Sequence, residues 1–175
     1  MLYKTIFFAL AIFSFNFAHA AIVNYSLSSV GGNTYVADFS VTNDSLGFPI
    51  EELTIYFMVG EYENIFITNS PIGWDPLAIE PDAGIPDDGF ADWLALGSGI
   101  GAGESLGGFS VQFDYLLADG SVPGGWDFEI VDPDTFGVLG GGVTGSAVVP
   151  LPGAAVLFLG SLVGISGLRL SRRFA

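Results

Sequence analysis

The strongest constraint on the fold is a two-residue alternation of apolar and polar side chains along the middle of the chain. Because successive side chains of a β-strand point to opposite faces, such segments predict strands with one buried face and one wet face. No segment from Ala21 to Val149 shows a helical period. We therefore expect an all-β domain here. The alternation is clearest in four segments: Tyr35–Thr42, Leu53–Val59, Phe109–Tyr115 and Trp126–Ile130.

Turn signals divide the same region into about seven or eight short strands. Clusters such as Gly31-Gly32-Asn33 and Pro123-Gly124-Gly125 separate the strands. This number and spacing predict an antiparallel β-sandwich. Glycine is so frequent in Gly137–Gly145 that the segment is also interpreted as a flexible stalk. Further strands are expected at Val23–Leu27, Ile65–Thr68, Asp92–Leu96 and Phe136–Val143.

The segment Ser70–Gly103 interrupts the pattern and is expected to be a long loop. It holds four prolines and two tryptophans, Trp74 and Trp93. Loops of this length in a compact domain are often functional. The two tryptophans either pin the loop to the sandwich, which we prefer, or stack on sugar rings. Trp126 lies on a patterned strand and is expected in the core.

Four aspartates of this segment form a weak candidate for a calcium site: Asp82, Asp87, Asp88 and Asp92. Calcium takes oxygen ligands from carboxylates and backbone carbonyls, and loops supply both. The order of residues does not match an EF-hand loop, which needs alternating acidic residues and a closing glutamate. A solvated acidic loop without metal is the simpler interpretation, and no other cofactor is expected.

The charge distribution restricts the partners of the central domain. All 19 acidic residues lie between Ala21 and Val149, whereas all four lysines and arginines lie outside this region. Nucleic acid, anionic lipid surfaces and phosphorylated substrates are disfavoured as partners, because no cation is present to meet a phosphate. Cations, basic proteins and neutral polymers such as polysaccharide are the partners that this charge allows.

The same region contains few groups that could carry catalysis. The chain has no cysteine, and its single histidine is His19. Thiolate chemistry, a histidine-based triad and a lysine nucleophile are therefore absent from residues 21–149. Paired carboxylates could hydrolyse glycosides, but no spacing motif selects a pair. We expect a protein that is not an enzyme, with a secreted glycosidase as a distant alternative.

Residues 1–20 are typical of a secretory signal peptide. Lys4 supplies positive charge, Ile6–Phe15 form an apolar core, and Ala18-His19-Ala20 place small residues before a cut at Ala20–Ala21. An uncleaved membrane helix is the alternative, and it is less favoured because the apolar run is short for a membrane span.

The C-terminal residues 146–175 combine three parts in a fixed order. A proline motif is followed by the uncharged run Gly153–Leu168. As a helix this run would be ~24 Å long, somewhat under a hydrocarbon core of ~30 Å. Leu170 and snorkelling of the arginines bring it close to spanning, so we expect a transmembrane helix over 153–168. The prolines keep the preceding segment extended, as a protease cleft requires. The motif consists of Val149, Pro150, Leu151, Pro152 and Gly153, and the basic end of Arg169, Arg172 and Arg173.

This tail resembles the VPLPA-type variant of PEP-CTERM sorting signals, although Gly153 stands where that variant usually has alanine. The resemblance implies export in a Gram-negative bacterium that makes exopolysaccharide. It also implies cleavage near the proline motif by an exosortase, a membrane enzyme. A plain anchor that is never cut is the alternative. Pro71-Ile72-Gly73-Trp74 and Gly107-Gly108-Phe109 also look like PEP-CTERM domains of unassigned role, a likeness that implies no activity.

These observations predict three parts: a signal peptide (1–20), an exported β-sandwich (21–145) and a sorting tail (146–175). The chain is expected to be anchored in the inner membrane before processing and then to reach the cell surface or extracellular matrix. We expect a structural or adhesive function. The alternative is a carbohydrate- or calcium-binding module of the same matrix. Expected partners are the exosortase and exopolysaccharide, and not nucleic acid.

Overall fold

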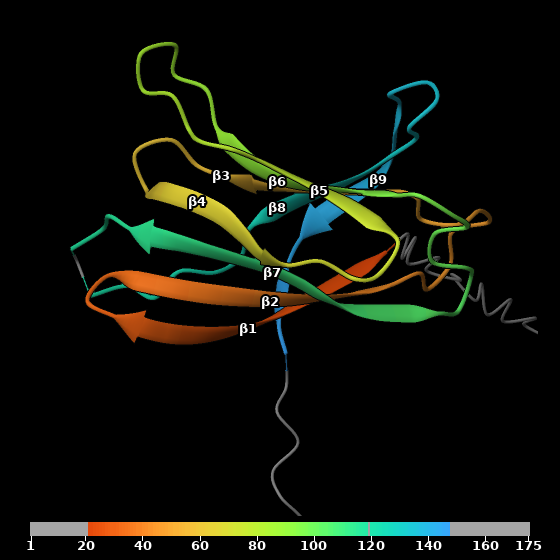
Figure 1. Cartoon of the computed structure of the whole chain (residues 1–175), viewed down its shortest axis with the longest axis horizontal. Coiled ribbons are helices and arrows are strands. Elements are labelled where there is room, and N and C mark those ends of the chain that lie inside the picture. Colours follow the sequence, from red (N-terminus) through yellow and green to blue (C-terminus); the bar gives the residue numbers. More distant parts are fainter. Residues whose placement is uncertain (1–20, 119, 148–175) are drawn as a thin grey trace, which may run out of the picture. The chain divides into compact units, whose positions relative to one another are not determined.

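The computed structural model describes residues 21–118 and 120–147, which form ten strands and no helix. The strands build two five-stranded sheets, in the orders β10-β1-β2-β7-β4 and β5-β6-β3-β8-β9. The two sheets lie face to face (Figure 1). The strands are β1 (Ile22–Gly31), β2 (Thr34–Thr42), β3 (Glu52–Phe57), β4 (Tyr62–Asn69), β5 (Trp74–Ile79), β6 (Gly89–Ala95), β7 (Ser105–Tyr115), β8 (Asp127–Val131), β9 (Val138–Val143) and β10 (Gly145–Ser146).

The predicted β-sandwich is confirmed. Strands β1 to β9 pair antiparallel with their neighbours, and each predicted strand segment overlaps an observed strand. The described residues hold more strands than the seven or eight expected, because β5 and β10 were not foreseen. The glycine-rich segment Val138–Val143 is strand β9 and pairs with β8. The interpretation of this segment as a flexible stalk is therefore wrong.

The expectation of a long loop over Ser70–Gly103 is also wrong. The segment contains β5 and β6, which pair with each other along their whole length. Pro76 lies in the middle of β5, and a proline in a strand ordinarily argues against sheet structure because it lacks the N–H donor. β5 tolerates Pro76 because it is an edge strand and has β6 as its only neighbour.

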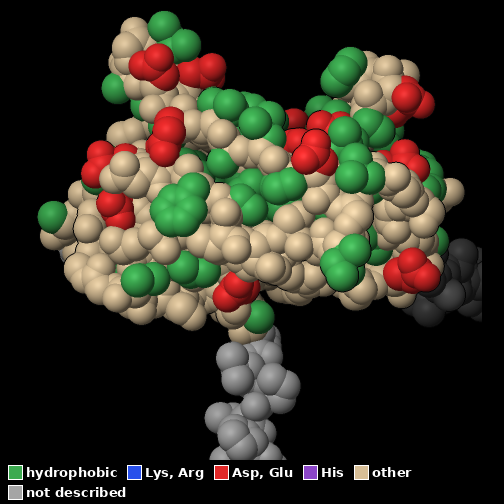
Figure 2. All heavy atoms as spheres, viewed as in Figure 1, with side chains coloured by type: hydrophobic (Ala, Val, Ile, Leu, Met, Phe, Trp, Pro, Cys, Tyr) green, Lys and Arg blue, Asp and Glu red, His purple; other side chains and the backbone are tan. Residues whose placement is uncertain are grey.

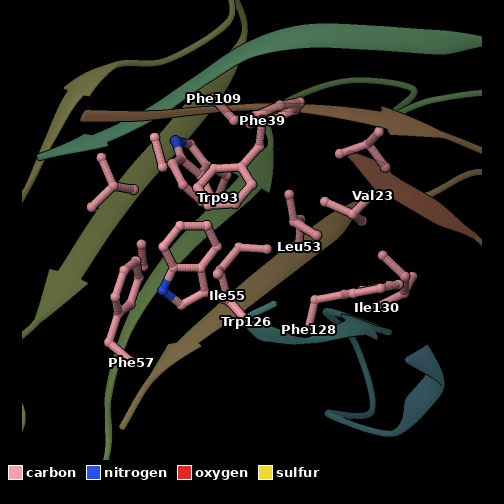
Figure 3. Packing of buried hydrophobic residues seen from close by; sticks show 14 of the residues in the cluster. Val23, Phe39, Leu53, Ile55, Phe57, Trp93, Phe109, Trp126, Phe128 and Ile130 are labelled. Atoms are coloured by element: carbon pink, nitrogen blue, oxygen red, sulfur yellow. The ribbon is translucent and has the colours of Figure 1, made fainter. Parts of the chain in front are cut away.

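Aromatic side chains from both sheets meet in the core. The ring centroid of Trp126 lies 4.8 Å from that of Tyr25, 5.4 Å from Phe39 and 5.6 Å from Phe113. Figure 3 shows Trp126, Ile55 and Phe128 on one side of the core and Phe39 and Phe109 on the other. Edge-to-face pairs of this kind add to the stabilisation from burial. The prediction that Trp126 belongs to the core is confirmed.

Trp74 and Trp93 are buried as well. Both rings contact Phe109 of β7 edge-on, at centroid distances of 5.1 and 5.4 Å. They pin β5 and β6 onto the opposite sheet, as preferred from the sequence. Their burial removes them as platforms for sugar rings.

Within residues 21–118 and 120–147 no helix is long and apolar enough to cross a membrane. The predicted signal peptide (1–20), transmembrane helix (153–168), proline motif (149–153) and terminal arginines all lie outside the described residues.

Candidate functional site

The outer face of the β5-β6-β3-β8-β9 sheet is bordered by two projecting hairpins. The β5–β6 connection (residues 80–88) and the β8–β9 connection (residues 132–137) rise on the same side of this sheet (Figure 1). Figure 2 shows acidic side chains on both projections, with apolar and acidic side chains between them. The sheet face between the hairpins is therefore the floor of an open channel.

The register of the strands places several polar side chains on this floor. Residues paired across antiparallel strands share a face of the sheet, so one row of partners runs across all five strands. The row consists of Leu77, Asp92, Thr54, Glu129 and Gly141. The parallel row through Ile79, Phe90 and Tyr56 is more apolar. The floor thus places an aromatic and aliphatic row next to a row that contains two carboxyls.

A groove of 470 Å³ follows the β8–β9 side of this floor. A smaller depression of 130 Å³ adjoins it and shares Tyr56, Asp88 and Asp127 with it. The groove is lined further by Glu129 and the backbone of Gly141. We call these two depressions together the outer groove. It combines aromatic side chains, of which Tyr56 lines both depressions, with four carboxylates, Glu61, Asp88, Asp127 and Glu129, and with bare glycine backbone.

Glycine in β9 is a structural requirement of the groove. A Cβ atom on Gly141 would lie 2.8 Å from the carbonyl oxygen of Phe128, which is closer than real contacts allow. On Gly142 it would lie 3.2 Å from the Phe128 ring. Strand β9 can approach β8 this closely only without side chains at these positions. Because Gly141 and Gly142 carry no side chains, the wall of the outer groove is also low beside Glu129.

Tyr56 is the central polar and aromatic group of the groove. Its hydroxyl donates a hydrogen bond to Glu129 Oε2 at 2.8 Å, and its ring meets Phe90 edge-on at a centroid distance of 6.5 Å. Burial, together with the bond to Glu129, raises the pKa of Tyr56 to about 12. The phenol therefore stays protonated at neutral pH and fixes the position of the Glu129 carboxylate.

A second pair of carboxyls, Glu52 and Asp92, lies on the same floor. The Thr54 hydroxyl donates to Asp92 Oδ1 at 2.7 Å, yet burial raises the pKa of Asp92. Burial and the charges of Asp92 and Asp132 raise the pKa of Glu52, whose Oε2 is buried without a hydrogen-bond partner. Neither carboxyl lines the outer groove. They are therefore not placed as an acid–base pair across this groove, the arrangement that glycoside hydrolysis there would need.

The four aspartates considered for calcium are not brought together. Asp82 and Asp87 face each other across the β5–β6 hairpin, and Asp82 Oδ1 accepts a bond from Gly84 N at 2.7 Å. Asp88 Oδ1 accepts from Val59 N at 2.7 Å, and Asp92 is held by Thr54 on the sheet. In the described part of the chain no three acidic or histidine side chains are arranged to hold a metal ion. Asp82 and Asp87 instead order the β5–β6 hairpin, while Asp88 and Asp92 bond to the β3–β4 connection and to β3.

The residues of the outer groove were not identified from the sequence. Tyr56 and Glu129 occupy outward positions in two correctly predicted strands. An aromatic residue at an outward, otherwise polar position was the available signal. Only the register between β3 and β8 shows that these two side chains meet.

No family model matches the chain, and no curated protein matches it either. A solved protein from Nocardia farcinica with an immunoglobulin-like fold has 17% identity and a TM-score of 0.50, covering 74% of this chain and 90% of that one. A mutant carbohydrate-binding module CBM3b from cellobiohydrolase 9A of Clostridium thermocellum has 17% identity and a TM-score of 0.38, over 75% and 98% of the two chains. A Vibrio harveyi exo-β-N-acetylglucosaminidase has 11% identity and a TM-score of 0.37, over 76% and 19%. The similarity to the first protein shows an immunoglobulin-like sandwich fold. The similarities to the other two are too weak to support a fold or a function.

Proposed function

We propose that the chain is an exported adhesive protein of the extracellular matrix whose outer groove binds polysaccharide. The observation that carries this proposal is the half-buried Tyr56 ring in an open groove with carboxyl groups beside it. Ligand sites typically combine apolar and aromatic lining with a few placed polar groups. An aromatic ring packs on the apolar face of a sugar, while carboxylates accept hydrogen bonds from its hydroxyls.

The open, shallow form of the groove favours a polymer over a small ligand. The outer groove lies on a sheet face flanked by hairpins rather than in an enclosed cavity (Figure 2). A polymer can run along such a channel and contact it with several successive sugars. A purely structural protein, which would bind no glycan, is the alternative.

Binding to a glycan panel tests this proposal. The whole chain, purified from cells that produce it, would be applied to an array of neutral, acidic and amine-bearing polysaccharides, and each positive would be measured by calorimetry. We expect saturable binding to neutral or amine-bearing chains and none to phosphorylated or sulfated ones. If no polysaccharide binds, the structural alternative takes its place.

We further propose that the C-terminal tail directs the chain to an exosortase-type enzyme, as its likeness to PEP-CTERM signals implies. The support is the order of proline motif, apolar run and arginines in residues 149–173. Mass spectrometry of the mature protein from native cells should show a C-terminus between about Val148 and Gly153, within reach of a membrane enzyme. Replacing Pro150 and Pro152 with alanine should leave uncut protein in the membrane. Arg172 and Arg173 on the mature surface protein would show that the tail is a permanent anchor.

A further inference from the structure

We infer that the outer groove prefers a polysaccharide that carries amino groups, such as a glucosamine polymer, over a neutral one. This inference rests on the proposed function and names the class of sugar that the same groove selects.

The charge along the groove is of one sign. Asp88, Asp127 and Glu129 line it together with Tyr56, and Glu52 and Asp92 lie on the adjoining floor. Residues 21–118 and 120–147 include no lysine, arginine or histidine, so this part of the chain supplies no basic side chain as a counter-charge. A protonated amine brings both a positive charge and three hydrogen-bond donors to groups that only accept. A neutral sugar brings hydroxyl donors but no positive charge.

The state of the floor carboxyls agrees with a missing counter-charge. Glu52 Oε2 is buried without a hydrogen-bond partner, and the pKa values of Glu52 and Asp92 are raised mainly by burial. An ordinary internal ion pair would shift them in the opposite direction. A ligand that places cations over this floor would relieve the cost of keeping these groups ionised.

The spacing of the carboxylates favours a polymer over a single metal ion. No three of them converge in the described part of the chain, so they form no cage of the kind that calcium needs. They are instead distributed along the channel, at Asp88 of the β5–β6 connection, which accepts a bond from Val59 N, and along β8 at Asp127 and Glu129. Charges repeated along a chain match charges distributed along a groove. The aromatic ring of Tyr56 can pack on the apolar face of a sugar. A basic peptide has no sugar face and would not make this contact.

A comparison of two oligomers of equal length tests the inference. Binding of the whole chain to a β-linked glucosamine hexamer and to its fully N-acetylated counterpart would be measured by calorimetry, below and above the pKa of the sugar amine. We expect the free-amine oligomer to bind at least about tenfold more tightly when it is protonated, and to lose this advantage when it is neutral or when salt is added. Tyr56 stays protonated over this range, because its pKa is about 12.

Two charge-matched variants locate the effect. Asp127→Asn removes an exposed carboxylate that lines both depressions of the groove, and it should reduce the preference for the amine by about threefold to fivefold. Asp44→Asn removes the same charge from an exposed turn of the domain and should leave the preference unchanged. An equal loss in both variants would mean that only the net charge acts, and this would overturn the inference.

The remaining outcomes separate the two proposals. Equal binding of both oligomers overturns the preference for amines and leaves polysaccharide binding intact. Failure of both oligomers and of every neutral glycan contradicts the proposed function itself. Binding of polylysine with the same affinity and the same dependence on Asp127 would show that the groove recognises basic protein, and this also overturns the inference.

Discussion

At the scale of single residues, Tyr56 connects the apolar and acidic parts of the outer groove. We predict that Tyr56→Leu, which removes the ring, weakens glycan binding by about fivefold to tenfold. Tyr56→Phe keeps the ring and loses only the bond to Glu129, so a smaller loss is expected. Calorimetry on the best polysaccharide of the panel measures both. Phe66→Leu, at an exposed ring of β4 on the other sheet, is the control and should have no effect. Unchanged binding by Tyr56→Leu would contradict the site.

Phe113 tests the core in the same way. It is fully buried and contacts Phe57, Tyr62 and Trp126 at centroid distances of 5.6, 5.3 and 5.6 Å. Phe113→Ala should lower the free energy of unfolding by ~3–5 kcal/mol, because it leaves a cavity among these rings. Chemical denaturation gives the value. Phe66→Ala, at a ring that is 47% exposed, should cost less than ~1 kcal/mol. Similar losses for both variants would show that Phe113 does not occupy the core.

The sequence predicted buried residues far better than groove residues. Alternation identifies the inward side of a strand directly, and Phe39, Ile55 and Phe113 are fully buried as expected. The outward side chains carry no such signal. Whether Tyr56 stands alone or in a groove depends on the neighbouring strand and on hairpins distant in sequence. That information lies in the register and not in the local pattern.

At the scale of elements, the wrong predictions concern segments rich in proline or glycine, because the effect of these residues depends on where the strand lies in the sheet. Pro76 made β5 look like loop, but an edge strand needs no donor on its free side. The glycines of β9 were compatible with a stalk, but they allow β9 to lie against the Phe128 backbone. In both cases the place of the strand in the sheet decides the outcome. The local composition of a segment does not reveal the position of its strand in the sheet.

The β8–β9 hairpin contains a strained residue that provides a further prediction. Phe136 has φ 57° and is 80% exposed, while its N–H donates to the Asp132 carbonyl at 2.7 Å. The left-handed conformation costs a non-glycine residue ~1–2 kcal/mol. Glycine avoids this cost but loses up to ~1 kcal/mol through the entropy of the unfolded chain. Phe136→Gly should therefore leave stability unchanged or raise it by up to ~1 kcal/mol.

Denaturation of a matched variant checks the backbone argument. Val138→Gly replaces another exposed apolar residue of the same hairpin, whose φ is not positive. It should lower stability by ~0.5–1 kcal/mol, because glycine only adds freedom to the unfolded chain. If Phe136→Gly costs as much as Val138→Gly, the strain at Phe136 is not relieved and the prediction is wrong.

At the scale of the whole molecule, stability should rise as the pH is lowered from neutral. The pKa values of Glu52 and Asp92 are raised above their ordinary 4.5 and 3.8, so the folded chain binds protons that the unfolded chain does not. Stability therefore increases as the pH falls through the folded pKa values, and the gain is complete below the unfolded ones. Hydrogen bonds lower the pKa values of Asp114 and Asp132. Their contribution is lost below their ordinary 3.8.

Melting temperatures across pH test this balance. We expect a maximum on the acid side of neutrality, above the ordinary pKa of 3.8 at which Asp114 and Asp132 begin to lose their contribution. The double variant Glu52→Gln, Asp92→Asn should be more stable than the wild type at neutral pH and should gain less on acidification. General repulsion among the other carboxylates persists in this variant and provides the internal comparison. An unchanged pH profile in the double variant would assign the effect to that general repulsion alone.

The last prediction separates screening from specific binding. With 19 acidic residues and no basic residue from Ala21 to Val149, repulsion is spread over the domain, and added sodium chloride should raise the melting temperature. Calcium would do more only through a site, since binding adds RT ln(1 + [L]/Kd) to stability. Because Asp82, Asp87, Asp88 and Asp92 are not brought together, the two salts should act equally at matched ionic strength. An extra gain in calcium that disappears in Asp87→Asn, Asp88→Asn would show that the β5–β6 hairpin closes around the ion.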